Sequence, residues 1–360
     1  MSEVLELTKK LVSVPSLAEN PDELRRVLAV ADEFLPEGLT RHRYERESKP
    51  SLVVGFSDTK HPRVLILGHL DVVDAKPEQF TPVLDGDRLL GRGVIDMKGP
   101  AAAVMVAVRE AWEAGRRPDV ALMLTTDEEV GSPNGVAYLV REEGWGADFV
   151  VIPDGGFNFT LTIKGKGAFH FRIFASGVAA HGSATWAGVN AIDKLLAFYD
   201  DLKPFFQLSS DDPAHWHETL NLGVIKGGKK VNIIPDEAEG HFDIRFTEAW
   251  TLSRVRDRVK ELAAKHGVEL EIWSEGEPFF TDPNNPYLRE FAACVARVLG
   301  HEPALGHEHG ATDGRFFSEK GTPTVIMYPE GGNLHADGEW VSVSSLLKLK
   351  EIMSQYLEGL

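Results

Sequence analysis

An apolar run at residues 120–124 ends directly in the acidic segment 125–129, and this junction constrains the fold more than any other feature. Such a run predicts a strand buried on both faces, as in an α/β sheet. Ligands bind beyond the carboxyl ends of such strands, so Glu128 and Glu129 would lie where chemistry takes place. Burying two like-charged carboxylates costs several kcal/mol unless a cation neutralises them. For an isolated pair of glutamates, a solvated acidic turn is the simpler interpretation. The residues at the ends of the other predicted strands therefore decide whether a functional site lies here.

Strands and helices alternate along both ends of the chain. Apolar runs at 64–67 and 149–152 predict further buried strands, and residues 99–114 predict a helix with an Ala- and Val-rich inner face. The alternation predicts an α/β domain with a mixed or parallel sheet and helices on both faces. At 360 residues the chain is long enough for two domains.

The pattern changes near residue 164 and resumes near 274. Between these points the expected order of elements is βαββαβ, which is typical of a ferredoxin-like α+β domain. We therefore predict a domain at 165–273 inserted into a domain that is built from 1–164 and 274–360.

Composition excludes several classes of protein. The formal net charge of −17 argues against nucleic acid as a partner, because phosphate binding needs clustered Lys and Arg. No apolar run is long enough to cross a membrane, and the first residues show no signal-peptide pattern. A single cysteine, Cys294, excludes an internal disulfide and a cysteine-based zinc site. These features together favour a cytoplasmic location.

Acidic residues and histidines follow several predicted strands. Imidazole and carboxylate groups both suit zinc, and a shared carboxylate can bridge two ions about 3.5–4 Å apart. Any one of these residues alone is better explained as structural, but their recurrence at successive strand ends indicates a two-metal centre. The residues are His69, Asp71, Asp96, Glu128, Glu129, Asp154 and His335.

Five motifs carry a resemblance to one known family: Gly68-His69-Leu70-Asp71, the segment 91–99 around Asp96, Asp127-Glu128-Glu129, Pro153-Asp154-Gly155, and His335. Together they closely resemble the M20 metallopeptidases over essentially the whole chain. That family holds carboxypeptidases, dipeptidases, aminoacylases, and acetylornithine and succinyl-diaminopimelate deacylases. The resemblance implies a zinc-peptidase-like catalytic domain, an inserted lid and dimerisation domain, and two divalent ions, zinc first, with cobalt or manganese as alternatives.

The resemblance also implies a ligand for each motif. Asp96 would bridge the two ions. His69 and Asp154 would complete one site, and Glu129 and His335 would complete the other.

Two further residues of these motifs receive supporting roles from the resemblance. Asp71 would hydrogen-bond the His69 ring and hold its tautomer. Glu128 would be the general base, which takes a proton from the attacking water and returns it to the leaving amine. The reaction would be metal-assisted hydrolysis of an amide.

In the inserted domain, His181 matches the family histidine that reaches the substrate carbonyl, usually from a partner subunit, so a homodimer is expected. Asn232 and Arg245 match positions that line the same cleft. Arg245 could clamp a substrate carboxylate, although a surface ion pair explains it equally well. Gly310 and Thr312 lie in a segment that resembles part of the cleft wall.

Two features depart from the family pattern or remain open. The tail motif spaces its acids differently after His335, so the roles of Asp337 and Glu339 stay open. The segment 307–309, His-Glu-His, is predicted to be a loop at the cleft wall rather than a metal site.

The preferred interpretation is a metallopeptidase that releases an amino acid from a dipeptide, a peptide C-terminus or an N-acyl-amino acid. Asp rather than Glu at 154 favours the dipeptidase and carboxypeptidase branches. The alternative is an N-acyl-amino-acid deacylase of the acetylornithine or succinyl-diaminopimelate type. A catalytically inactive metal-binding scaffold is the alternative of another class, and the presence of Glu128 argues against it.

Overall fold

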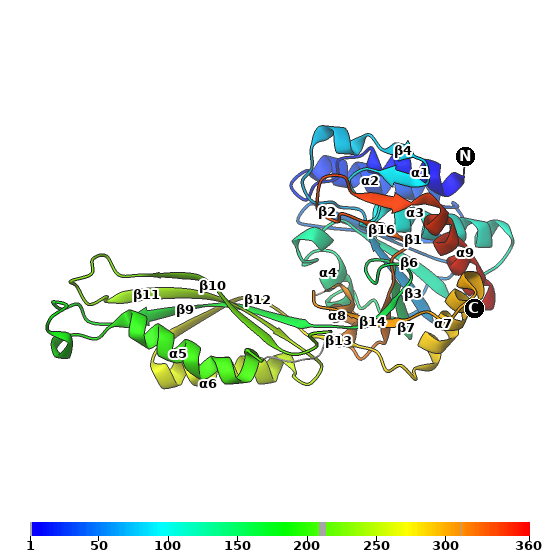
Figure 1. Cartoon of the computed structure of the whole chain (residues 1–360). Coiled ribbons are helices and arrows are strands. Elements are labelled where there is room, and N and C mark those ends of the chain that lie inside the picture. The colour runs from blue at the N-terminus through cyan, green and yellow to red at the C-terminus, as the bar shows by residue number, and fades with distance from the viewer. Residues whose placement is uncertain (1, 209–213, 311) are drawn as a thin grey trace. The chain divides into compact units, whose positions relative to one another are not determined.

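The computed structural model describes residues 2–208, 214–310 and 312–360. The chain divides into two compact units (Figure 1). Unit 1 comprises 1–163, 280–307 and 316–360, and unit 2 comprises 164–279 and 308–315. The assignment of a catalytic role to one domain and a lid role to the other stays a prediction.

The largest sheet is mixed and has the strand order β1-β2-β6-β3-β7-β15-β8-β13, with β14 paired to β8. Its middle strands β6, β3, β7 and β15 run parallel to one another, whereas β2 is antiparallel to β6. The strands are β1 Thr40–Arg46, β2 Lys49–Gly55, β3 Val64–His69, β6 Val120–Thr125, β7 Phe149–Ile152, β8 Leu161–Gly165, β13 Phe279–Phe280, β14 Leu305–Glu308 and β15 Thr324–Ile326.

The apolar runs form the buried middle of this sheet. Every residue of β3, β6 and β7 is buried, as expected for strands covered on both faces. Because these strands are parallel neighbours, their carboxyl ends lie at one edge of the sheet. The segments that follow them therefore meet at that edge.

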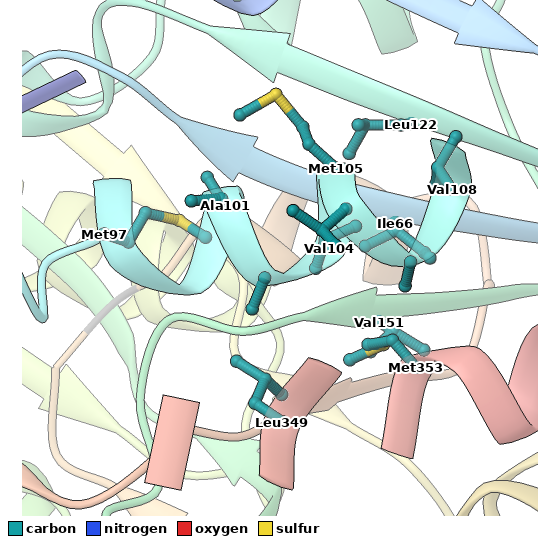
Figure 2. Close-up of a cluster of buried hydrophobic side chains, with 14 of the residues drawn as sticks. Ile66, Met97, Ala101, Val104, Met105, Val108, Leu122, Val151, Leu349 and Met353 are labelled. Atoms are coloured by element: carbon teal, nitrogen blue, oxygen red, sulfur yellow. The ribbon is translucent and has the colours of Figure 1, made fainter. Parts of the chain in front are cut away.

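Helices cover the sheet and complete the core of unit 1. Asn20 caps the N-terminus of α2, with Pro21 in the first turn, and the Asn20 side chain accepts a hydrogen bond from the backbone N–H of Glu23. Figure 2 shows apolar side chains of α3 meeting Ile66 of β3 and Leu349 of α9 in one cluster. The helices of this unit include α1 Glu3–Val12, α2 Pro21–Phe34, α3 Lys98–Glu113, α4 Val136–Arg141, α7 Pro286–Leu299 and α9 Val343–Gly359, and α8 spans Gly314–Ser318.

A second, small sheet has the order β16-β17-β5-β4. Strand β5, Arg88–Leu90, pairs antiparallel with β17, Trp340–Ser342, and β17 pairs with β16, Gly331–Gly332. The loop after β5 leads to α3, and the loop 333–339 joins β16 to β17. This sheet therefore places two loops distant in sequence beside each other. The remaining elements of unit 1 are β4 Val83–Asp85 and the 3-10 helices η1 Pro77–Phe80 and η2 Glu128–Val130.

Unit 2 has the βαββαβ order expected of a ferredoxin-like domain. Its four strands form an antiparallel sheet in the order β10-β11-β9-β12, and α5 and α6 cover one face of it (Figure 1). Phe171, Phe198 and Phe242 pack together in its core. The elements are β9 Gly167–Ser176, η3 Thr185–Ala187, α5 Ala191–Phe206, β10 Thr219–Gly227, β11 Glu237–Phe246, α6 Leu252–His266 and β12 Glu269–Gly276.

The predicted fold class, an α/β domain with a mixed sheet and an inserted α+β domain, is confirmed by this architecture. Each unit has its own hydrophobic cluster, so each can bury its apolar surface without the other. Within the part of the chain that the structure describes, no helix combines the length and the apolar character that a membrane span requires.

Candidate metal centre

The sheet edge of unit 1 collects the five predicted metal ligands. His69 is the last residue of β3, Glu129 lies in η2 directly after β6, and Asp154 follows β7. Two loops supply the others: Asp96 precedes α3, and His335 lies between β16 and β17. The side chains form two groups that share Asp96, and within each group the donor atoms lie within 4.8 Å of one another.

Asp96 occupies the centre of this arrangement. Its Oδ1 lies 3.1 Å from Nε2 of His69, and its Oδ2 lies 3.0 Å from Nε2 of His335. The His69 Nε2 atom is 3.7 Å from Oδ2 of Asp154, and the His335 Nε2 atom is 3.2 Å from Oε2 of Glu129. One carboxylate therefore directs its two oxygens toward two different histidines.

These separations suit ligands of common ions. Zinc binds nitrogen and oxygen donors at about 2.0–2.2 Å, so two ligands of one tetrahedral ion lie about 3.3 Å apart. Nitrogen and carboxylate oxygen donors also fit cobalt and manganese. The donor set and its spacing thus fit divalent metal in both groups.

The carboxylates and histidines of the centre shift one another's pKa values. His69 is fully buried, and desolvation opposes its protonation, yet hydrogen bonds to Asp154, Asp71 and Asp96 raise its pKa well above the ordinary value. Hydrogen bonds to Asp96 and Glu129 raise the pKa of His335 to about 10. Burial alone would raise the pKa of Asp96, but the two histidines hold it far below its usual range. Without metal, the histidines would therefore take up protons to balance the carboxylates.

Asp71 links two of the candidate ligands. It is fully buried, and its Oδ2 accepts a 3.0 Å hydrogen bond from the backbone N–H of Glu129. The Nδ1 atom of His69 lies 3.1 Å from the backbone carbonyl of Asp71 and 3.4 Å from its Oδ1. Both are acceptors, so Nδ1 of the neutral ring carries the proton and Nε2 is left free for a metal.

Glu128 lies next to these ligands at the start of η2. It is half-buried, and its backbone carbonyl accepts a 2.7 Å hydrogen bond from Gly131, which closes the short turn. The neighbouring Asp127 is fully buried, and its Oδ2 accepts bonds from the backbone N–H groups of Asn134 and Gly135. Hydrogen bonds within the segment therefore stabilise this turn, and the two adjacent glutamates lie at its start.

Tyr328 is also part of this centre, although the sequence-based prediction did not include it. Tyr328 is buried, and its hydroxyl donates a hydrogen bond to Oδ1 of Asp154. It lies just beyond the carboxyl end of β15, the parallel neighbour of β7. The strand-end rule that selected the acids and histidines would have selected Tyr328 as well, had it been applied to tyrosine.

The sequence left open the roles of Asp337 and Glu339, and the structure gives these two residues different surroundings. Asp337 is exposed and pairs with Lys76 at the surface. Glu339 is buried, and its carboxylate contacts Arg92 and the loop that carries Asp96. Only Glu339 therefore belongs to the surroundings of the centre.

The predicted substrate residues all lie in unit 2. His181 is exposed, and its Nδ1 lies 2.8 Å from the Ser183 hydroxyl. Asn232 is also exposed, and its carbonyl accepts a hydrogen bond from Gly182, so the segments that carry His181 and Asn232 lie side by side. Gly310 is exposed and Thr312 is half-buried.

Arg245 is engaged within its own sheet. Its Nε donates a 2.9 Å hydrogen bond to Asp243, and a terminal nitrogen lies 3.3 Å from His170. These contacts favour the ion-pair interpretation that the sequence left open beside the carboxylate clamp.

The structure corrects one local prediction. His307 and Glu308 lie in the short strand β14 and not in a loop, because this segment pairs with β8. Among the described residues, no group with metal-like spacing includes them.

The fold and the donor set place the chain among metal-dependent hydrolases of the mixed α/β type. The chain belongs to peptidase family M20/M25/M40, whose model matches residues 65–359. It is therefore a hydrolase of peptide or linear amide bonds, and the predicted resemblance is confirmed.

Curated relatives extend over most or all of the chain. A succinyl-diaminopimelate desuccinylase of Gluconacetobacter diazotrophicus is 31% identical over 321 residues, 83% of this chain and 81% of that protein. One of Alkalilimnicola ehrlichii is 28% identical over 379 residues, covering 100% of both chains. These relatives favour the deacylase alternative over the peptidase interpretation that the sequence analysis preferred.

Solved structures of low sequence identity share the fold. The aminopeptidase PepT of Bacillus cereus gives a TM-score of 0.81 at 18% identity, covering 99% of this chain and 97% of its own. An M20 family metallo-carboxypeptidase of Sulfolobus solfataricus, Sso-CP2, gives 0.79 at 18% identity, covering 99% of both chains. At this identity they support the architecture and carry no argument about substrate.

Proposed function

We propose that this chain is a two-metal amide hydrolase that removes an acyl group from an N-acylated amino acid. The observation that carries the proposal is the carboxylate of Asp96, which presents one oxygen to His69 and the other to His335. A single carboxylate placed in this way suits a bridge between two ions. The names of the curated relatives indicate which acyl group is removed, namely a succinyl group attached to the amine of an amino acid.

Each ion would have its own ligands besides Asp96. His69 and Asp154 would hold one ion, and Glu129 and His335 would hold the other. Asp71 would keep His69 in the tautomer that binds metal, and Tyr328 would orient Asp154. When bound, divalent ions of this kind polarise the amide carbonyl and lower the pKa of water.

Glu128 would move the proton. It takes a proton from the attacking water and delivers it to the nitrogen of the departing amine, so the amide C–N bond breaks and a carboxylate and an amine form. Its place beside Glu129 supports this division of work, because in the same turn one carboxylate can bind metal while the other faces the reacting water.

The residues of unit 2 would bind the substrate. His181 would donate a hydrogen bond to the carbonyl oxygen as negative charge develops on it. Asn232, on the adjacent segment, would contact the substrate nearby, with Gly310 and Thr312 in the cleft wall. Arg245 is the weakest member of this set because Asp243 already holds its guanidinium.

We further propose a homodimer formed through unit 2. Strand β10 is an edge strand with mostly exposed residues, among them Val224 and Ile225, and such an edge can pair with a second copy of the chain. Trp186 is 85% exposed, and Val178 and Val189 are also exposed. The cytoplasmic location expected from the sequence stays a prediction.

A substrate panel tests the proposed reaction. Purified enzyme loaded with zinc, cobalt or manganese is given N-succinyl and N-acetyl amino acids and a matched set of dipeptides. We expect cleavage of the succinylated compounds with the highest kcat/KM. Cleavage of dipeptides alone would contradict the deacylase assignment.

Peptidase activity remains the second candidate because of Asp154. Asp rather than Glu at position 154 resembles the dipeptidase and carboxypeptidase branches of the family, and its carboxylate lies among the candidate ligands. The same panel therefore compares both functions on one enzyme preparation.

A further inference from the structure

We infer that the buried ion pair between Glu339 and Arg92 is a positioning clamp that sets the affinity of one metal site, the site formed by Asp96, Glu129 and His335. The inference rests on the proposed two-metal function. It assigns to Glu339 a role in metal binding that the sequence analysis left open.

The carboxylate of Glu339 holds the backbone of the loop that carries Asp96. Its Oε1 accepts hydrogen bonds from the backbone N–H groups of Gly93 at 2.9 Å, Ile95 at 3.1 Å and Asp96 itself at 3.4 Å. Glu339 is only 1% exposed, so water does not compete for these bonds. One side chain thereby fixes the path of the loop up to the residue that both candidate sites share.

The loop can take this path because of its glycine. Gly93 has φ of +85°, and a Cβ atom added there would lie 2.9 Å from Cγ1 of Val72. The backbone N–H of Gly91 also bonds the backbone carbonyl of Glu339. The close approach of the two loops is therefore built into the backbone as well as into the ion pair.

Arg92 connects the clamp to the loop that carries His335. Its Nη1 donates a 2.5 Å hydrogen bond to Oε2 of Glu339, and its Nη2 lies 3.4 Å from the backbone carbonyl of Ala336, the residue after His335. Both partners are buried, so the pair is held in a fixed geometry. The clamp thus joins two loops that lie 247 residues apart in sequence.

The two candidate sites depend on this clamp to different extents. The site with Glu129 takes both Asp96 and His335 from the clamped loops, whereas the other site takes only Asp96. The remaining ligands of that other site are fixed by the sheet, because His69 ends strand β3 and Asp154 follows strand β7. Loosening the clamp should therefore weaken one of two bound ions more than the other.

A metal titration of the apoprotein tests this difference. Glu339→Gln keeps the size of the side chain but removes its charge. We expect one of the two zinc equivalents to bind about tenfold or more weakly, as is typical for residues that orient metal ligands, and the other to stay within about threefold of the parent. When cobalt replaces zinc in the titration, the visible absorption of the cobalt ion at the weakened site should change.

Three further variants separate positioning from general stability. Asp32→Asn breaks an ion pair with Arg41 that is far in sequence from every candidate ligand, and it should leave both equivalents unchanged. In a His335→Ala background, where the clamped site is already damaged, adding Glu339→Gln should have little further effect. Should Glu339→Gln fail to fold, Arg92→Lys, which keeps the charge but loses the planar guanidinium, should weaken the same equivalent.

The outcomes distinguish this inference from the proposed function. A parent protein that binds no stoichiometric metal would overturn the two-metal function itself. A parent that binds two ions, with Glu339→Gln binding both as tightly as the parent or losing both equally, would overturn only the clamp.

Discussion

The two units hold their candidate functional residues in different ways. In unit 1, the candidate ligands His69 and Asp96 are buried, lie at the ends of strands or in clamped loops, and have strongly shifted pKa values. In unit 2, His181 and Asn232 are exposed and are held by local contacts within loops. The first set is fixed by its contacts within the unit, whereas the second set is exposed to solvent.

This difference suggests a division of work. Burying a preorganised cluster of charged groups costs free energy of folding. Such a cluster is therefore useful where its charges stabilise the charge that develops during the reaction. Exposed side chains on a separate unit can adapt to a substrate without disturbing that cluster. Changes in unit 1 should therefore alter metal binding and kcat, and changes in unit 2 should leave the metal in place.

Asp96→Asn should have the largest effect. Asp96 belongs to both candidate groups, and an amide cannot give each ion a charged oxygen, so both metal equivalents should weaken and turnover should fall to background. Metal content by mass spectrometry and turnover of an N-succinyl amino acid are the measurements. The matched control is Asp337→Asn, at the exposed acid near His335, which should retain metal and activity.

Glu128→Ala should separate chemistry from metal binding. We expect kcat to fall by about 10²–10⁴-fold while two equivalents of metal remain, because loss of a general base removes proton transfer and no ligand. Single-turnover kinetics and metal analysis of the same sample provide the check. Unchanged turnover would remove Glu128 from the mechanism.

His181→Ala should lower kcat by about 10²–10³-fold with metal content unchanged, as expected for a group that stabilises an oxyanion. Co-expressing His181→Ala with Glu128→Ala chains tests whether the histidine acts in the partner subunit. If it does, half of the randomly formed dimers regain one intact site, and activity should return to about a quarter of the parent value.

Two other outcomes of this experiment would contradict a role for His181 in the partner subunit. No recovery on co-expression, with dimers present by sedimentation, would place His181 in its own subunit. A parent enzyme that is monomeric and fully active would contradict the role in trans altogether.

The smallest effect should be a pH dependence of the metal-free protein. The pKa of His335 is raised from 6.5 to about 10, so the protonated ring stabilises the folded state. This contribution is fully present below about pH 6.5 and is lost as the pH rises toward about 10. In urea unfolding of the two apoproteins, the free energy of unfolding of the parent minus that of His335→Ala should decrease as the pH rises across this range.

A reference variant isolates this contribution. Burial lowers the pKa of Lys98 to about 7, which makes stability rise with pH over part of the same range. The difference in free energy of unfolding between the parent and His335→Ala cancels this opposing effect, because Lys98 is common to both. A difference that does not change with pH would show that His335 is not coupled to Asp96 and Glu129 in the apoprotein.

Much of the site could be predicted from sequence because of its position on strands. Residues such as His69 and Glu129 lie shortly after apolar runs, and strand ends of an α/β sheet meet at one edge. Tyr328 obeys the same rule but was missed, since tyrosine is not a usual zinc ligand. Arg245 illustrates another limit. Alternation along a strand places Asp243 and Arg245 on the same face, but the sequence could not decide between this ion pair and a substrate carboxylate.

The sequence by itself determined the elements of this protein, the class of its fold and the chemical nature of the donor groups, because apolar periodicity and residue type are local properties. Only the tertiary structure decided how those groups meet. The orientation of Asp96 toward two histidines and the contact of Glu339 with a loop some 240 residues earlier depend on the pairing of β5 with β17. Such pairings between distant segments are set by packing of the whole unit, and no local stretch of sequence contains them.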